Sequence, residues 1–323
     1  MKKNIFYSAL MLLTAGLTFT ACSDDELSST SVIVADQSAV IENDLDRWLT
    51  ANFLDPYNIQ IKYRYDDNES NMSYYEVPSR IEDANLLAHI LKYCCLEAYD
   101  NAVGIDFTRR NFPKLFFFTG EWRYKNNGSF VLGTAEGGRK VFLLGTRYLT
   151  PIMEGKSSFG TLSFDEGNDI IRNLNHYYLK TIHHEFTHIL NQTQPYPTTY
   201  KLITADSYVS DTWNSAPNNT GYLGRGYISA YSQQEDREDF AEVMALYVTN
   251  SADQWEAWMR EAAETTNSNG KTGRQLLEQK LSVVRDYMKK NWNINIDLLR
   301  AEILKRQDDV AAKRVDLTDL TIY

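Results

Sequence analysis

Two histidines four residues apart, with a glutamate directly after the first, form the clearest chemical pattern in this sequence. His184 and His188 enclose Glu185 in the run His-Glu-Phe-Thr-His. On an α-helix, residues four apart lie on one face, so both imidazoles can bind a single metal ion. Glu185 projects about 100° around the helix from His184 and can accept a proton from water on that ion. The spacing therefore predicts a Zn²⁺ site with two histidine ligands and Glu185 as general base.

The histidine pair falls within a predicted long helix. Apolar side chains recur at helical spacing along residues 171–189 and would bury the face opposite the motif. This stripe comprises Ile171, Leu174, Tyr178, Ile182, Phe186 and Ile189. The alternative interpretation is that the two histidines pack structurally and that Glu185 is a surface residue. Because a bare match to the pattern can arise by chance, the helical context is the observation that favours a metal site.

A catalytic zinc ion needs a third protein ligand and an open position for water. The residues directly after His188 contain no further histidine, so this ligand must come from elsewhere in the chain. Glu238 is the candidate, because its alanine-lined helix face can pack closely against the motif helix. That face also carries Ala241, Glu242 and Ala245. Two imidazoles and a carboxylate suit zinc best, although related ligand sets also hold iron or manganese.

Carboxylates on an inward helix face are costly to bury without partners. A metal ion would be such a partner for Glu238, and a metal-binding histidine would be one for Glu242. We therefore expect Glu242 to accept a hydrogen bond from His184 or His188 and to fix its tautomer. The alternative is a solvated acidic helix start, which the helix dipole favours. That alternative suits Glu235, Asp236 and Asp239 well.

The paired motifs resemble those of a known family. The second motif, Glu238-Asp239-Phe240-Ala241-Glu242, begins 50 positions after His188. Together, the run from His184 to His188 and this second motif resemble those of the gluzincin clan. More narrowly, the chain resembles Bacteroidetes lipoproteins called putative zinc-binding metallopeptidases, or substrate-import-associated zinc metallohydrolases. The resemblance implies a zinc-dependent hydrolase, often encoded beside outer-membrane nutrient importers. TonB-dependent uptake components of the outer membrane are therefore expected partners, together with a peptide or protein substrate.

Tyr231 is a second candidate catalytic residue. It lies seven residues before Glu238, where lethal-factor-like gluzincins place a tyrosine near the zinc-bound intermediate. Its hydroxyl could donate to a developing oxyanion. Coincidence is the alternative, because the chain has 21 tyrosines. The remaining histidines are not assigned to zinc, and these are His89, His176 and His183.

The N-terminus is typical of a bacterial lipoprotein. In residues 1–21, two lysines precede an apolar run that ends at small residues, as in a secretory signal. Thr20-Ala21-Cys22 resembles a lipoprotein processing site, which implies that the sulfur of Cys22 is acylated, although Phe19 departs from the usual leucine. A free or disulfide-bonded cysteine is the alternative. We expect membrane association through this lipid anchor only.

Residues 22–35 are predicted to be an acidic and polar tether. Ser23-Asp24-Asp25-Glu26 resembles the tag that sends Bacteroidetes lipoproteins to the outer face of the outer membrane, and a solvated linker is the alternative. We expect an outer-membrane lipoprotein exposed at the cell surface, with the periplasmic face as alternative. The formal net charge of −10 argues against nucleic-acid binding. Cys94 and Cys95 are expected to be buried thiols on a core helix, without a disulfide.

The rest of the chain predicts one α+β domain with a zincin-like metallopeptidase fold over residues 36–323. We expect an N-terminal helix and sheet lobe over 36–164 and a helical C-terminal lobe over 165–323, with the cleft between them. Helices are predicted at about 39–54, 81–101, 236–249, 252–264, 271–290 and 296–307, and strands at 59–65, 114–119, 129–132 and 140–144. The polar stretch 192–234 is long for a connection and is expected to border the substrate cleft.

Three functions are compatible with these features. The first is a zinc-dependent metallopeptidase in which Glu185 activates water. The second is a non-catalytic binding component of an outer-membrane uptake complex for glycans or peptides, with a vestigial zinc site and aromatic side chains in 196–231 that stack on sugars. The third is a zinc hydrolase for a non-peptide amide or ester. The intact Glu185 favours an enzyme, because a structural site needs no base beside the metal.

Overall fold

The computed structural model describes residues 42–70, 73–125, 130–266 and 270–322. The predicted signal sequence, Cys22 and the tether 22–35 lie outside the described residues. Within them the fold is a mixed α+β arrangement, mostly helical with small sheets, so the predicted α+β class is confirmed at this level. No helix in these ranges is long and apolar enough to cross a membrane.

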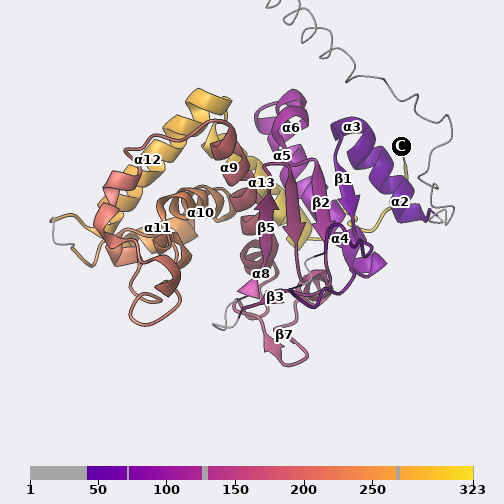
Figure 1. Cartoon of the computed structure of the whole chain (residues 1–323), viewed down its shortest axis with the longest axis horizontal. Coiled ribbons are helices and arrows are strands. Elements are labelled where there is room, and N and C mark those ends of the chain that lie inside the picture. The colour runs from indigo at the N-terminus through magenta and orange to yellow at the C-terminus, as the bar shows by residue number, and fades with distance from the viewer. Residues whose placement is uncertain (1–41, 71–72, 126–129, 267–269, 323) are drawn as a thin grey trace, which may run out of the picture. The chain divides into compact units, whose positions relative to one another are not determined.

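A four-stranded sheet of order β1-β2-β6-β5 forms the centre of the N-terminal half (Figure 1). Its strands are β1 (Gln60–Lys62), β2 (Leu115–Phe118), β6 (Lys140–Leu143) and β5 (Gly133–Glu136). The first three are parallel, and β2 and β6 contain runs of buried apolar residues, as expected for parallel strands covered by helices. β5 is antiparallel to β6 and ends the sheet.

The sequence prediction missed β5, because Gly-Thr-Ala-Glu has little intrinsic strand preference. Its pairing with the strongly apolar β6 holds it in the sheet. Two smaller hairpins lie outside this sheet. They are formed by β3 (Arg123–Tyr124) with β4 (Phe130–Val131) and by β7 (Ser158–Phe159) with β8 (Leu162–Ser163).

Helices of the N-terminal half pack around the sheet. They are α2 (Asp44–Leu49), η1 (Thr50–Leu54), α3 (Asp55–Tyr57), α4 (Ile81–Ile90), η2 (Leu91–Leu96), α5 (Glu97–Ala102), α6 (Ile105–Asn111), η3 (Thr146–Tyr148) and α7 (Leu149–Met153). The predicted helix 81–101 corresponds to α4, η2 and α5, which run on without a break. Cys94 and Cys95 are buried free thiols on η2, as predicted.

The predicted motif helix is continuous from residue 170 to residue 193. It comprises α8 (Ile170–Leu174), a π-helical turn η4 (Asn175–Leu179) and α9 (Lys180–Thr193). α9 packs against β5 at Gly133, where an added Cβ would lie 2.5 Å from Cγ2 of Thr181. A glycine in β5 therefore allows the motif helix to approach the edge of the sheet closely.

Residues 194–235 form no strand and only single 3₁₀ turns, as expected for the long polar stretch. These turns are η5 (Lys201–Ile203), η6 (Ala205–Ser207), η7 (Ser210–Thr212), η8 (Leu223–Arg225) and η9 (Tyr231–Gln233). The helices that follow are α10 (Asp236–Thr249), α11 (Ala252–Ala262), α12 (Gly273–Trp292) and α13 (Ile296–Ala311). All four were predicted within a few residues of these bounds.

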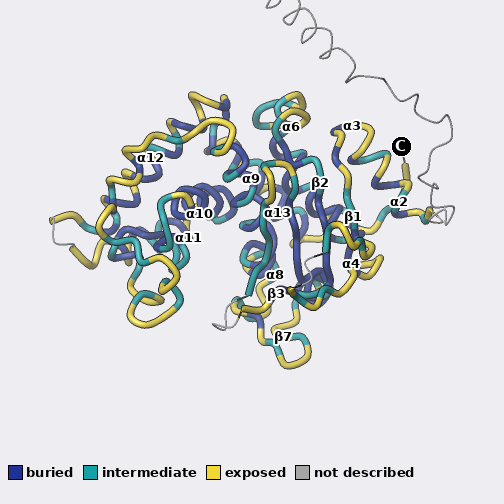
Figure 2. The backbone as a smooth tube through the Cα atoms, in the orientation of Figure 1, coloured by how far each residue is buried: buried dark blue, intermediate teal, exposed yellow. Residues whose placement is uncertain are grey.

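α10 lies at the centre of the helical half, between α9 and α12 (Figure 1), and its tube is mostly dark blue in Figure 2. α13 packs against both α10 and α5, so it joins the two halves. The chain then returns to α4, where Nε2 of His89 lies 2.9 Å from the carbonyl oxygen of Asp319. The C-terminal segment is thus part of the N-terminal half in space.

Candidate metal centre

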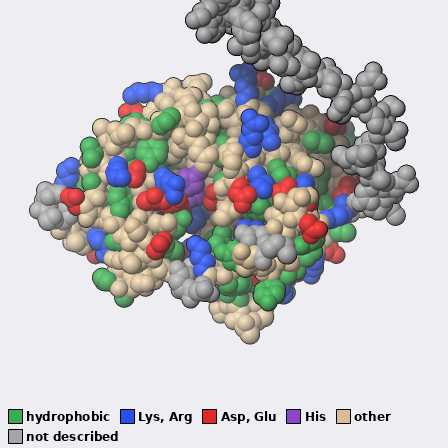
Figure 3. All heavy atoms as spheres, in the orientation of Figure 1, with side chains coloured by type: hydrophobic (Ala, Val, Ile, Leu, Met, Phe, Trp, Pro, Cys, Tyr) green, Lys and Arg blue, Asp and Glu red, His purple; other side chains and the backbone are tan. Residues whose placement is uncertain are grey.

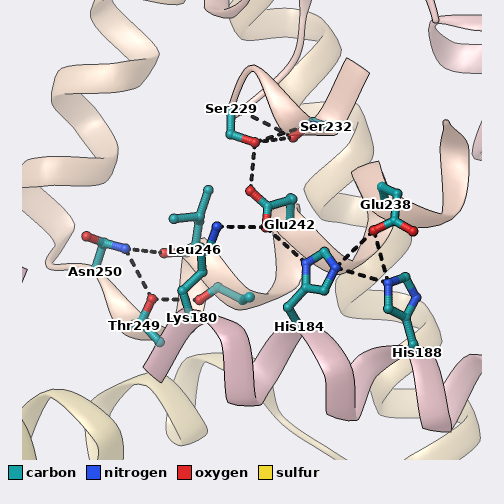
Figure 4. A network of polar contacts seen from close by, with 11 residues as sticks. Lys180, His184, His188, Ser229, Ser232, Glu238, Glu242, Leu246, Thr249 and Asn250 are labelled. Atoms are coloured by element: carbon teal, nitrogen blue, oxygen red, sulfur yellow. Dashed lines mark hydrogen bonds and ion pairs between the residues drawn. The ribbon is translucent and has the colours of Figure 1, made fainter. Parts of the chain in front are cut away.

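Three side chains from α9 and α10 bring their ligand atoms together. Nε2 of His184 and Nε2 of His188 are 3.0 Å apart. Oε2 of Glu238 lies 3.0 Å from the first and 3.2 Å from the second (Figure 4). Among the described residues, these are the three histidine, cysteine or acidic side chains that could hold a metal ion together. The structure therefore contains the candidate site His184, His188 and Glu238 that the sequence predicted.

The spacing of these atoms fits zinc. Ligand atoms about 2.0–2.1 Å from a tetrahedral zinc ion are about 3.3 Å from one another. The three separations in this centre are 3.0, 3.0 and 3.2 Å. Two imidazole nitrogens and a carboxylate oxygen also form a typical ligand set for a zinc ion that keeps one position open.

Antiparallel packing of α10 on α9 positions the third ligand. Glu238, near the start of α10, lies opposite His188, and Thr249, at its end, accepts a hydrogen bond of 2.7 Å from Asn175. Ala241 and Ala245 are fully buried between these contacts. Their small side chains allow the axes of α9 and α10 to approach each other closely. This is the close packing that the sequence predicted for this face of α10.

Glu242 lies one turn beyond Glu238 and contacts the other side of His184. Its Oε1 is 2.9 Å from Nδ1 of His184 and 3.3 Å from Nζ of Lys180. Its Oε2 accepts a hydrogen bond of 2.7 Å from the hydroxyl of Ser229 (Figure 4). The structure thus places Glu242 where it can hold the ring of His184 with Nε2 facing the metal position.

The sequence prediction missed Lys180 and Ser229. Lys180 precedes His184 by one helical turn on the same face, so i,i+4 spacing offered a signal for it. No pattern in the sequence points to Ser229, because a loop residue reaches Glu242 only through the fold. Ser232 also bonds to Ser229, at 3.0 Å between the hydroxyl oxygens, and fixes its orientation.

Two buried carboxylates contact opposite sides of the His184 ring. Burial opposes ionisation of Glu238, but contacts with His184 and His188 outweigh it and lower the pKa of this carboxyl below its ordinary range. Burial also opposes ionisation of Glu242, but Lys180 and His184 outweigh it and lower the pKa of Glu242 to about 2. Burial opposes protonation of His184, yet Glu238 and Glu242 raise its pKa to about 10. Such an environment stabilises positive charge between the side chains, as a divalent cation requires.

Glu185 and Tyr231 lie beside the three ligands. Glu185 is half-buried on α9, and it is not part of the described group that could hold the metal. The ring of Tyr231 is 5.9 Å from that of His184, and the ring of Trp213 packs edge-on against it at 5.1 Å. Burial, followed by the charges of Glu238 and Glu242, raises the pKa of Tyr231 well above its ordinary value. Its hydroxyl is therefore a proton donor in hydrogen bonds.

The other histidines lie away from the three ligands, as predicted. His183 is fully buried, with Nδ1 3.3 Å from the hydroxyl of Tyr99 and Nε2 3.8 Å from Sγ of Cys95. Burial lowers its pKa to about 3, so the ring is neutral. His176 contacts Asp165 at 3.1 Å, and His89 stacks on a tryptophan ring of α2.

One prediction for the start of α10 was wrong. Asp239 was expected to be solvated, but it is fully buried and its Oδ2 lies 2.6 Å from Nζ of Lys280. The prediction failed because the partner lies on α12, about forty residues later, where no local pattern indicates it. Glu235 and Asp236 lie at the helix start and are half-buried, and Asp236 accepts a hydrogen bond from Tyr196 at 2.8 Å.

Part of this centre reaches the molecular surface. Figure 3 shows a histidine side chain at the surface of the face drawn, with acidic and basic side chains on either side of it. Of the two motif histidines, His184 is buried and His188 is partly exposed. The side chain of His188 is therefore the part of the histidine pair that solvent reaches.

Comparison with known proteins agrees with this geometry. The family described as "Putative zinc-binding metallo-peptidase" matches residues 38–297, which include all three ligands. The chain belongs to this metallo-peptidase family. A crystal structure described as a putative zinc-binding metallo-peptidase from Bacteroides caccae is 35% identical to this chain, covers 87% of it and 96% of its own length, and gives a TM-score of 0.66. No curated protein matches the chain.

The match to the metallo-peptidase family covers most of the described chain. The match begins before α2 and ends at the start of α13, so it spans the sheet, the motif helix and α10. The descriptions of the family and of the structure from Bacteroides caccae both name zinc binding. The sequence-based resemblance to zinc-binding metallopeptidases is confirmed at this level.

Proposed function

We propose that this protein is a zinc-dependent metallopeptidase of the gluzincin type, with a zincin-like catalytic domain. The observation that carries the proposal is the convergence of the ligand atoms of His184, His188 and Glu238 within 3.2 Å of one another, with Glu185 directly after His184 in the same helical turn. The arrangement of the elements supports a zincin-like domain. The motif helix α9 packs against the edge strand β5, and the third ligand comes from the following helix α10.

A peptide is the proposed substrate because β5 is an edge strand with which an extended peptide could pair. β5 is the terminal strand of the described sheet and packs against α9, close to the motif. The N–H and C=O groups on its outer edge can pair with an extended peptide, which would then lie beside the metal position. This arrangement favours a main chain over a sugar as ligand.

A zinc ion held by the three ligands would polarise the scissile carbonyl and lower the pKa of a bound water towards about 7. Glu185 then accepts a proton from the attacking water as the new C–O bond forms. Tyr231 donates a hydrogen bond to the oxygen that gains negative charge. Protonated Glu185 passes its proton to the leaving nitrogen as the C–N bond breaks. Glu242, which is itself paired with Lys180, holds the ring of His184 in place throughout.

The direct test is digestion of an unbiased peptide library by the purified protein, analysed by mass spectrometry. We expect cleavage that stops with a chelator such as 1,10-phenanthroline and returns when zinc is added. If the zinc-loaded protein cleaves no peptide, the peptidase proposal is wrong. Binding of peptides or glycans without turnover would instead support the non-catalytic component of an uptake complex, and turnover of small amides or esters would support a non-peptide hydrolase.

We also propose where the enzyme acts. The lipoprotein-like segment around Cys22 supports anchoring of the domain to the outer membrane by acylation, with the tether 22–35 leading to the folded part. The acidic run after Cys22 supports exposure at the cell surface. TonB-dependent uptake components of the same membrane are the proposed partners, because peptides released there could enter through them.

A further inference from the structure

A fully buried ion pair lies directly behind the metal ligand Glu238. Asp239 on α10 and Lys280 on α12 are both completely inaccessible, and Oδ2 of Asp239 is 2.6 Å from Nζ of Lys280. The proposed reaction uses neither residue. Because Asp239 is adjacent to a ligand in the chain, the pair can influence the centre through the backbone of α10.

The ammonium group of Lys280 binds three different groups. Besides Asp239, it donates a hydrogen bond of 2.7 Å to the carbonyl oxygen of Gly226 and lies 3.9 Å from the ring centre of Tyr227. Asp239 in turn accepts a hydrogen bond of 3.0 Å from the hydroxyl of Tyr208. One lysine thus links α12, α10 and two points of the loop 204–233.

The loop also touches α12 directly at Gly226. This glycine has φ +86°, and an added Cβ would lie 2.6 Å from Cβ of Leu276, one turn before Lys280. A larger residue would therefore displace the loop from α12. Glycine at this position lets the carbonyl of residue 226 come within reach of the lysine.

The loop segment that Lys280 contacts, Gly226 and Tyr227, is followed within a few residues by side chains of the metal centre. Three residues after Gly226, Ser229 donates to Glu242, and two residues later Tyr231 packs beside His184. The two ends of the loop are also joined, since the backbone N–H of Val209 donates to the carbonyl of Gln233 at 2.8 Å. A shift at Gly226 would therefore move both side chains that reach the centre from the loop.

A buried ion pair is a poor source of stability, because apolar residues of similar volume often stabilise as much or more. We propose that Lys280 and Asp239 are positioning residues of the metal centre. The pair fixes the first turn of α10, which carries Glu238, relative to the loop that carries Ser229 and Tyr231. This inference rests on the proposed zinc site, and its test requires no substrate.

The test compares the double variant Lys280→Met/Asp239→Asn, which removes both charges, with the wild-type protein. We expect cooperative thermal unfolding, about tenfold weaker zinc binding in a chelator competition titration, and an altered visible spectrum after cobalt substitution. Without metal, trypsin should cut the loop at Arg225 about tenfold faster. Tyr208→Phe, which removes only the hydrogen bond to Asp239, should change these values in the same direction and by less.

The matched control is the pair Arg123 and Glu76, whose side chains are both 6% exposed. Arg123 lies on β3 and packs over rings of Tyr74 and Phe142, in the N-terminal half. Arg123→Met/Glu76→Gln should lower stability but leave zinc affinity and the cobalt spectrum unchanged.

The positioning role would be overturned if Lys280→Met/Asp239→Asn and Tyr208→Phe both had the zinc affinity, cobalt spectrum and loop cleavage of the wild-type protein. The positioning role would also be overturned if Arg123→Met/Glu76→Gln changed the cobalt spectrum as much as Lys280→Met/Asp239→Asn does. A wild-type protein that binds zinc but cleaves no peptide would contradict the proposed function alone, and the metal measurements would still decide this inference.

Discussion

Nδ1 of His184 lies 2.9 Å from Oε1 of Glu242, on the side of the ring opposite to the Nε2 that faces His188 and Glu238. When a metal ion binds Nε2, the single ring proton is on Nδ1, beside the carboxylate of Glu242. A carboxylate in this place makes the imidazole a stronger ligand and reduces the freedom of its ring.

Glu242→Gln should therefore weaken zinc binding without removing it. We expect an affinity about tenfold to a hundredfold lower, because the amide keeps the shape of the side chain but loses the charge. A competition titration with a chromogenic chelator measures the change. Glu278→Gln on α12 is the control, since Glu278 is exposed and pairs with Arg274, and equal affinity in both variants would show that Glu242 does not support the ligand.

Tyr231→Phe should reduce turnover and leave zinc bound. The hydroxyl is the proposed donor to the developing oxyanion, and loss of one such donor costs about 10²–10³ in kcat. Tyr124→Phe, at an exposed tyrosine of β3, should have no effect. A wild-type kcat in Tyr231→Phe would mean that the nearness of this ring to His184 is coincidental.

Gly226→Ala should destabilise the protein by about 2–4 kcal/mol, combining a left-handed backbone with overpacking against Leu276. Gly160→Ala separates the two effects, because Gly160 has φ +61° and an added Cβ there would meet no atom within 4 Å. It should cost only the backbone part, about 1–2 kcal/mol. Chemical denaturation measures both, and equal losses would rule out the close contact between the loop and α12.

Local patterns predicted the elements of the site well. The i,i+4 spacing of His184 and His188 and the small residues of α10 are properties of single helices, and both lie where periodicity placed them. Glu238 could be chosen because its helix face was readable from the sequence. Position alone does not establish the chemical role of a side chain, so the roles of Glu185 and Tyr231 remain predictions for kinetic measurement.

Contacts between distant segments were not predictable in the same way. The burial of Asp239 depends on Lys280, and the orientation of Glu242 depends on Ser229 in the loop. β5 exists because β6 pairs with it, although its own residues have little preference for a strand. In each case the partner is fixed by tertiary structure, so the sequence near the residue contains no signal.

Cys22→Ser should release the protein from membranes, because acylation requires the thiol of the residue that follows the signal. Fractionation of cells that express the variant, with detection in the soluble and detergent-extracted fractions, measures this. Cys94→Ser is the control, since Cys94 is buried in the core and cannot anchor a lipid. Detergent-dependent membrane association of Cys22→Ser would contradict the lipid anchor.

The central claim assigns Glu185 and Glu238 to different tasks at one zinc ion. Its most direct test is zinc content and peptide hydrolysis measured together on the wild-type protein, Glu185→Gln and Glu238→Gln. We predict that Glu185→Gln keeps a full equivalent of zinc while hydrolysis falls at least about a hundredfold, and that Glu238→Gln loses zinc and, as a consequence, activity. Full zinc in Glu238→Gln, or wild-type hydrolysis by Glu185→Gln, would contradict the account.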